Sequence, residues 1–302
     1  MDSQSADLKC ASWKNDPRGH AGTAPAFSCG LIINSYNQPE YLSRVLSSVA
    51  TQSLRPAEVL IADDGSTDET RRVIDDWRER AAIPCQHVWQ EHVGFRRSRI
   101  LNLTISRATA DYLIFLDGDT VPHPDFVSDH ILLARRGFFV QGHRCLVGKT
   151  AARSFGLKAF RSDRLKALLS GQLATVKQAF RWPRPWRRIR RDLKGIRGCN
   201  LGIWRQDLIA VNGYNEAFTG WGREDSELAV RLMNSGVQRL DVRGWALCFH
   251  LWHPPASRAA LDRNDDLLAV AQSEKRVYCA CGLNKNLSAS ASPTTQPPCA
   301  EP

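Results

Sequence analysis

The sequence lacks any apolar run long enough to cross a membrane as a helix. No stretch approaches the roughly 18 consecutive apolar residues that such a helix needs. Residues 1–9 are polar and acidic, and they contain neither the apolar core nor the cleavage site of a secretory signal. These absences predict a protein that starts and stays in the cytoplasm.

The cysteines lack the spacing of metal ligands. Nine of them are scattered along the chain, and the single Cys279-x-Cys281 pair is too little for a zinc site. An odd number of cysteines in a cytoplasmic chain predicts reduced thiols, several of them buried as small apolar groups. The cysteines therefore indicate neither a zinc centre nor disulfides.

Basic charge is concentrated in one segment. The net charge is +10, and the segment 181–197 alone holds eight basic residues against one acid, Asp192. The rest of the chain is only mildly basic. This distribution argues against nucleic-acid binding over a whole face and indicates one localised basic feature.

Between a flexible leader, residues 1–26, and a flexible tail, residues 284–302, strands alternate with helices. The sequence predicts strands at 28–34, 58–62, 86–89 and 112–116, with helices between them that include 95–108. Strands that are apolar on both faces predict a mainly parallel sheet covered on both sides. Ligands of such sheets bind beyond the carboxyl ends of the strands.

An acidic cluster follows each of two predicted strands. Asp63 and Asp64 can accept hydrogen bonds from ribose hydroxyls or a base N–H. The alternative is an ordinary turn, in which Ser66 and Glu69 form a capping box for the next helix. Asp117-Gly118-Asp119, a D-x-D motif, offers oxygen ligands that suit Mg²⁺ or Mn²⁺ bridging a diphosphate, with a solvated turn as the alternative.

Two further groups of polar residues lie in the second half of the chain. Glu224 and Asp225 open a predicted helix, where a carboxylate either complements the helix dipole or serves as a general base for an attacking hydroxyl. His250 and His253 follow an apolar run, and a histidine at a strand end can supply a further protein ligand to a metal.

The order of these motifs resembles the inverting glycosyltransferases of family 2, which have the Rossmann-like, nucleotide-sugar-binding GT-A fold. The motifs that carry this resemblance are Asn34-Ser35-Tyr36-Asn37, Asp63-Asp64-Gly65-Ser66-Thr67-Asp68 and Phe115-Leu116-Asp117-Gly118-Asp119. The second half is similar to the C-terminal half of β-1,4-galactosyltransferases and bacterial chondroitin polymerases. Its matching motifs are Gly198-Cys199-Asn200-Leu201-Gly202, Gly213-Tyr214-Asn215-Glu216 and Gly220-Trp221-Gly222-Arg223-Glu224-Asp225.

The resemblance implies one α/β catalytic domain with a sheet flanked by helices. It divides the domain into a nucleotide-sugar-binding half at 27–150, a basic helical insert at 151–197 and an acceptor-binding, catalytic half at 198–283. It also implies a metal-dependent hexosyltransferase with a UDP-sugar donor, a glycan or lipid-linked acceptor, and Mn²⁺ or Mg²⁺ as cofactor.

The resemblance further implies a role for each matching residue. Asp225 would be the catalytic base, with Glu224 beside it to hold acceptor or sugar hydroxyls. Asp119 would be a metal ligand together with a histidine, His250 or His253, and the choice between the two stays open. Trp221 and Gly222 would line the acceptor pocket. The residues implied to bind the donor are Ser35, Asp63, Asp64, Arg97, Arg99, Asn102 and Asp117.

Because the chain shows no membrane anchor, it looks like a bacterial enzyme of cell-surface glycan synthesis, such as lipopolysaccharide or capsule. The Trp- and Arg-rich segment 181–197 suits an anionic surface of the inner membrane or the phosphates of a lipid-linked acceptor, with a solvated loop as the alternative. A nucleotidyltransferase would need a Gly-rich phosphate loop at 34–37, which is missing. A non-catalytic RNA- or membrane-binding protein using 181–197 is the other alternative, and it leaves Asp117 and Asp225 without a purpose.

Overall fold

The structure, a computed structural model, describes residues 26–156 and 160–289. The leader expected at 1–26 and the end of the tail expected at 284–302 therefore lie almost wholly outside the described residues. No helix in the two described ranges is long and apolar enough to cross a membrane.

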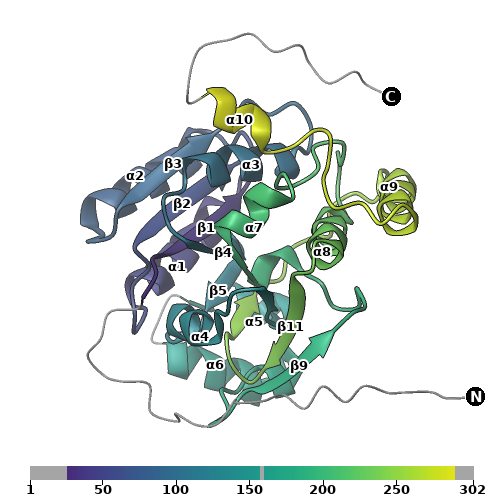
Figure 1. Ribbon diagram of the computed structural model, residues 1–302. Helices are drawn as coiled ribbons and strands as arrows, with labels where there is room; N and C mark the ends of the chain where they lie inside the picture. Colours follow the sequence, from purple (N-terminus) through teal and green to yellow (C-terminus); the bar gives the residue numbers. More distant parts are fainter. Residues whose placement is uncertain (1–25, 157–159, 290–302) are drawn as a thin grey trace, which may run out of the picture.

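An eight-stranded sheet forms the centre of the molecule, in the order β3-β2-β1-β4-β10-β6-β11-β9. Figure 1 shows β1 to β4 side by side in its upper part and β11 and β9 in its lower part. The first four strands of the sheet are parallel, as the sequence predicted: β3 (Cys85–Trp89), β2 (Glu58–Asp63), β1 (Cys29–Ser35) and β4 (Tyr112–Asp117). The other strands make the sheet mixed: β10 (Leu201–Trp204), β6 (Phe138–Gln141), β11 (Gln238–Arg243) and β9 (Trp186–Arg190).

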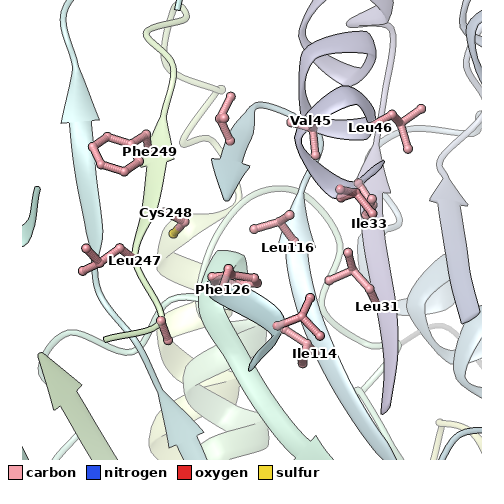
Figure 2. Packing of buried hydrophobic residues seen from close by; sticks show 14 of the residues in the cluster. Leu31, Ile33, Val45, Leu46, Ile114, Leu116, Phe126, Leu247, Cys248 and Phe249 are labelled. Atoms are coloured by element: carbon pink, nitrogen blue, oxygen red, sulfur yellow. The ribbon is translucent and has the colours of Figure 1, made fainter. Parts of the chain in front are cut away.

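Helices cover both faces of this sheet, because β1, β2 and β4 are apolar on both sides. Leu31 and Ile33 of β1 pack with the apolar side of α1 (Pro39–Ala50), as Figure 2 shows, and that cluster also includes α2 (Asp68–Arg80) and α4 (Phe126–Leu133). Ile32 faces the opposite way, into a cluster with α3 (Arg97–Arg107), α7 (Arg205–Ala210) and α8 (Glu224–Asn234). The predicted layered architecture is therefore confirmed.

A smaller four-stranded sheet carries the chain past the D-x-D motif. Its order is β5 (Thr120–Pro122), β12 (Cys248–His250), β7 (Arg144–Val147) and β8 (Leu173–Ala174). β12 runs antiparallel to β5 with His250 opposite Thr120, and the amide of Leu251 donates to the carbonyl of Asp119 at 2.9 Å. This pairing brings the end of the chain's second half next to the D-x-D motif of the first.

The insert at 151–197 is only partly helical. Its start overlaps the end of α5 (Lys149–Ala152), and it contains α6 (Phe160–Leu169) and a short 3₁₀ turn at Val176–Gln178. Its basic part, however, contains the edge strand β9. Pro183 and Pro185 exclude a helix at this point, and the free edge of β11 supplies the hydrogen bonds of a strand. Arginines along an edge strand also oppose pairing with another chain.

Three smaller expectations were wrong. Ser66 does not cap α2, because its Oγ accepts a hydrogen bond from the amide of Asn37 at 2.9 Å, and the helix starts after Thr67 without a side-chain cap. Residues 284–289 form α10 (Asn284–Ala289), where the sequence indicated a flexible tail. Among the described residues, six cysteines are free thiols, but Cys281 is disulfide-bonded. Helix α9 (Leu261–Ser273) packs against α8.

Candidate active site

The carboxyl ends of the parallel strands bring four of the predicted donor residues, Ser35, Asp63, Asp64 and Asp117, to one edge of the sheet. Ser35 at the end of β1 lies opposite Asp63 of β2, and Asn34 lies opposite Asp117 of β4. Asp64 follows Asp63, and its amide donates to the carbonyl of Ser35 at 3.1 Å. Since β1 to β4 are parallel, this edge is the crevice where a ligand is expected.

Asp64 is a buried carboxylate held by neighbours from the loop after β3. It accepts hydrogen bonds from the Gln90 side chain at 2.5 Å and from the amide of Arg96 at 3.0 Å. Burial raises the pKa of Asp64, against these bonds and the charges of His92 and Arg96. Arg99 donates to the amide oxygen of the same Gln90 side chain at 2.8 Å, so Arg99 orients Gln90.

Asp63 and Asn102 point into the protein and hold loops in place. Asp63 accepts from the amide of Ser66 at 2.8 Å and pairs with His87 at 2.8 Å, and 1% of the residue is exposed. Asn102 exchanges bonds with the backbone of Tyr214 at 2.8 Å in each direction and also donates to Glu216. These contacts hold both side chains away from the edge where Ser35, Asp64 and Asp117 lie.

The glycine of the D-x-D motif packs closely against the end of β1. A Cβ on Gly118 would lie 3.1 Å from the carbonyl oxygen of Asn34 and 3.2 Å from the Ser35 hydroxyl. The amide of Gly118 donates to that carbonyl at 2.7 Å, which fixes the turn between Asp117 and Asp119. The Ser35 hydroxyl itself is buried and has no hydrogen-bond partner in the described structure.

Arg97, at the start of α3, joins the two halves of the chain. Its guanidinium donates to Asp225 at 2.8 Å, to Glu224 at 3.2 Å and to Asp117 at 3.3 Å. Burial opposes its charge, but Asp225, Asp117 and Glu224 raise the pKa of Arg97 well above its ordinary value. The predicted donor and catalytic residues thus meet at one buried cation.

The three carboxylates around Arg97 outnumber its single positive charge. Burial raises the pKa of Glu224 to about 7, and the neighbouring Asp225 adds to the effect. Burial likewise raises the pKa of Asp117 to about 6, with Arg97 opposing the shift and Asp119 and Asp225 adding to it. One oxygen of Glu224 is buried without a partner, which also disfavours its ionised form.

We expect the stability of the protein to fall between pH 5 and pH 7 because of Glu224. In this range the folded protein binds a proton at Glu224 that the unfolded chain, with an ordinary pKa of 4.5, has released. The free energy of unfolding therefore decreases as pH rises, by at most about 1.4 kcal/mol per pH unit. Urea denaturation at several pH values, without divalent metal, should show a shallower decrease for Glu224→Gln than for wild type. The exposed control Glu79→Gln should show the same pH dependence as wild type. If the stability of Glu224→Gln falls with pH as steeply as that of wild type, Glu224 is not the cause of the decrease.

Asp225 is a partly exposed carboxylate that accepts hydrogen bonds on both of its oxygens. One oxygen accepts from Arg97, and the other accepts from the amide of Gly198 at 2.8 Å, while its side chain is 20% exposed. A Cβ on Gly198 would overlap the side-chain ends of Arg97 and Asp225, so a side chain at this position would displace both groups. The carboxylate is therefore oriented on both oxygens and still open to solvent.

A candidate metal centre is formed by Asp119, His250 and His253. One ligand atom from each lies within 4.8 Å of the others, and Asp119 is 3.0 Å from the Nε2 of His253 and 3.6 Å from that of His250. Burial lowers the pKa of His250 to about 4, so its ring is neutral and free to bind a metal. Burial alone would raise the pKa of Asp119, but both histidines lower it.

The chemistry of this donor set fits a divalent cation. Nδ1 of His253 lies 2.7 Å from the carbonyl of Pro254, an arrangement that leaves Nε2 as the ligand atom facing Asp119. One carboxylate with two imidazoles suits Mn²⁺ better than Mg²⁺, which prefers oxygen ligands. Both histidines left open by the sequence therefore lie at the centre.

The predicted acceptor residues lie on the loop that leads into α8. Trp221 is 41% exposed, and the guanidinium of Arg258 lies 5.7 Å from the centre of its ring. Gly222 has a φ of +110°, a conformation that favours glycine, and its carbonyl accepts from Asn264 at 2.9 Å. The loop thus presents an exposed ring next to Glu224 and Asp225.

Sequence reasoning missed several residues of this region. Tyr36 stacks on His92 with ring centroids 4.4 Å apart, and His92 in turn contacts the carbonyl of Asp64 at 2.9 Å. Gln90 holds Asp64, and Gly198 holds Asp225. Tyr36 and Gly198 stood inside quoted motifs and could have been found, whereas Gln90 and His92 lie in the irregular loop after β3 and carry no local signal.

Comparison with known proteins places these motifs in two family models. The model described as "Glycosyl transferase family 2" matches residues 31–150, and the model described as "N-terminal domain of galactosyltransferase" matches residues 184–253. Together they span the D-x-D motif, the Glu224–Asp225 pair and both histidines. Residues 151–183 of the insert lie between the two matches, and its basic end, residues 184–197, belongs to the second match.

Individual relatives and structures are similar over most of this chain. Validoxylamine A glucosyltransferase of Streptomyces hygroscopicus subsp. limoneus is 29% identical over 68% of this chain and 48% of its own length. Chondroitin synthase of Escherichia coli is 24% identical over 77% of this chain and 36% of its own length, so the chain spans half or less of these relatives. The crystal structure of GalNAc-T7 with UDP, GalNAc and Mn²⁺ has a TM-score of 0.58 at 13% identity, covering 87% of this chain and 53% of that one. This last similarity shows a shared fold.

Proposed function

We propose that this chain, which has the GT-A fold and matches the glycosyltransferase family 2 model over residues 31–150 and the galactosyltransferase model over residues 184–253, is an inverting enzyme that uses a UDP-sugar. The acceptor would be a hydroxyl of a glycan or glycolipid. The observation that carries the proposal is the position of Arg97 between Asp117, at the donor edge of the sheet, and Asp225. A donor and an acceptor bound on either side of this arginine would meet at Asp225.

In the proposed reaction, Asp225 takes the proton of the acceptor hydroxyl while that oxygen attacks the anomeric carbon of the donor sugar. The bond from this carbon to the diphosphate breaks on the opposite side, so a single displacement inverts the configuration. Arg97 and the amide of Gly198 hold Asp225 in the orientation that accepts the proton. Glu224 beside it would hold a sugar or acceptor hydroxyl, and Trp221 would pack against the acceptor.

We assign donor binding to the crevice at the ends of β1, β2 and β4. Asp64 and Ser35 are the carboxylate and hydroxyl available to the nucleoside, and Tyr36 with His92 supplies an aromatic surface for the base. Asp63, Arg99 and Asn102 would support this region through the loops that they hold, in place of the direct contact that the family resemblance implied.

The proposed cofactor is Mn²⁺ or Mg²⁺, held by Asp119, His250 and His253. When bound there, a divalent cation neutralises the negative charge that develops on the leaving diphosphate. The matching structure of GalNAc-T7 was solved with UDP and Mn²⁺, which supports the same pairing of nucleotide and cation here.

We place the enzyme in the cytoplasm of a bacterium, in the synthesis of a cell-surface glycan such as lipopolysaccharide. The segment 181–197 would give it a peripheral contact with the anionic inner membrane. Trp182, Trp186 and Ile189 are 36–48% exposed among its arginines, the composition of a membrane-surface segment. The same surface would serve the alternative function, a non-catalytic membrane- or RNA-binding protein.

A screen of UDP-sugars tests the proposed function. We expect the purified protein to release UDP from one donor in the presence of Mn²⁺ and to stop when a chelator is added, because the leaving diphosphate needs charge neutralisation. Donor binding without release would indicate only that the acceptor is missing. If no UDP-sugar binds with or without metal, the glycosyltransferase proposal fails and the basic segment becomes the centre of the function.

A further inference from the structure

A cleft lies beside the candidate active site, between α8, α9 and residues 193–197. Its volume is about 440 Å³, within the roughly 300–1,000 Å³ that is usual for small-molecule sites. The two helices lie side by side in Figure 1 and pack through Val230 and Leu268. Two walls of this cleft are therefore helices that support each other, and the third is the turn at residues 193–197.

The cleft carries an excess of positive charge. Lys194, Arg197 and Arg223 line it against one acid, Asp265, which is paired with Arg223. Within residues 26–156 and 160–289, Lys194 and Arg197 have no carboxylate at ion-pair distance, and the Arg197 side chain donates only to the carbonyl of Ile196 at 2.9 Å. Two cations without counter-ions in a concave surface attract an anion.

The chain connects this cleft directly to the proposed base. Gly198, whose amide donates to Asp225 at 2.8 Å, follows Arg197, and Arg223 precedes the Glu224–Asp225 pair. Ser226, one residue after Asp225, lines the cleft. The donor edge, in contrast, contacts Arg97 through Asp117. A molecule that meets Asp225 and extends along residues 197–198 would leave the donor edge free.

We propose that this cleft binds an anionic group, a carboxylate or a phosphate, on the acceptor molecule. The inference rests on the proposed function, since it takes Asp225 as the base that meets the acceptor. Arg197 offers the paired N–H groups that match a carboxylate or phosphate, and Lys194 adds a mobile point charge. An acceptor that carries such a group would be held with its free hydroxyl toward Asp225, and a neutral acceptor would lack this anchor.

The test compares an anionic probe with its neutral counterpart. Methyl glucuronide and methyl glucose-6-phosphate represent the two anions, and methyl glucoside is the neutral reference; binding is measured by NMR titration to protein saturated with UDP and Mn²⁺. We expect at least one anionic probe to bind roughly tenfold more tightly than methyl glucoside, with a preference that weakens as salt is raised. The better of the two anions identifies the group.

The double variant Lys194→Gln/Arg197→Gln should lose this preference. The control Arg71→Gln/Arg72→Gln removes the same charge from two exposed positions of α2 and should keep it. Equal or absent binding of the probes by wild type, or an unchanged preference in the first variant, overturns the inference. UDP binding in the same samples reports on the donor site: if UDP itself does not bind, the proposed function fails, whereas UDP binding without anion preference rejects the cleft alone.

Discussion

Replacing Asp225 by asparagine should lower the rate of sugar transfer roughly 10²- to 10⁴-fold, the usual contribution of a general base. Asparagine has the same shape and can still accept a hydrogen bond from Arg97 or from the amide of Gly198, which Asp225 accepts in the structure. It cannot take the proton of the acceptor hydroxyl. The loss should therefore appear in kcat, while the affinity for the UDP-sugar changes little.

Steady-state kinetics and calorimetric binding of UDP, measured on the same preparations, separate these effects. The control Asp262→Asn alters an exposed carboxylate on α9 and should keep full activity. A rate within a fewfold of wild type for Asp225→Asn would show that another group takes the proton, and Glu224, with its pKa raised to about 7, would be the next candidate.

Much of the fold could be predicted because its signals are local. β1, β2 and β4 are apolar along their length, so burial on both faces and a parallel arrangement followed directly. The row of Ser35, Asp64 and Asp117 followed as well, since parallel strands end at the same edge of a sheet. The basic edge strand could not be predicted: Trp186–Arg190 is a strand only because β11, some fifty residues later, offers a free edge.

The site was harder to predict because a sequence motif does not tell in which direction each of its side chains points. Arg97 and Asn102 belong to one stretch of the sequence, but five residues of a helix turn by about 140° relative to each other. Arg97 therefore faces Asp225, while Asn102 faces the loop at Tyr214. The meeting of Arg97 with Glu224 and Asp225 joins residues 127 and 128 positions apart, and only the packing of α8 on the sheet creates it.

Removing the carboxylate of Asp119 should lower turnover about as much as removing the divalent cation. Lewis-acid neutralisation of a leaving group contributes several kcal/mol, so we expect Asp119→Ala to lower turnover roughly 10³-fold at saturating donor and Mn²⁺. Asp119 is also the residue that both histidines contact, and without it the raised pKa of His253 should return toward its ordinary value. The control Asp266→Ala, on the exposed side of α9, should behave as wild type.

A titration with Mn²⁺ tests which of the two histidines is a metal ligand. His253 lies nearer to Asp119 and has its other nitrogen against the carbonyl of Pro254, whereas His250 is neutral and fixed in β12. If both bind the cation, His250→Ala and His253→Ala each weaken Mn²⁺ binding, measured by titration in the presence of UDP, by roughly tenfold or more. If one variant binds Mn²⁺ as wild type does, that histidine is not a ligand. If Asp119→Ala also keeps its Mn²⁺ affinity, the cation binds elsewhere, and the contacts among the three side chains serve only to join the segments around β5 and β12.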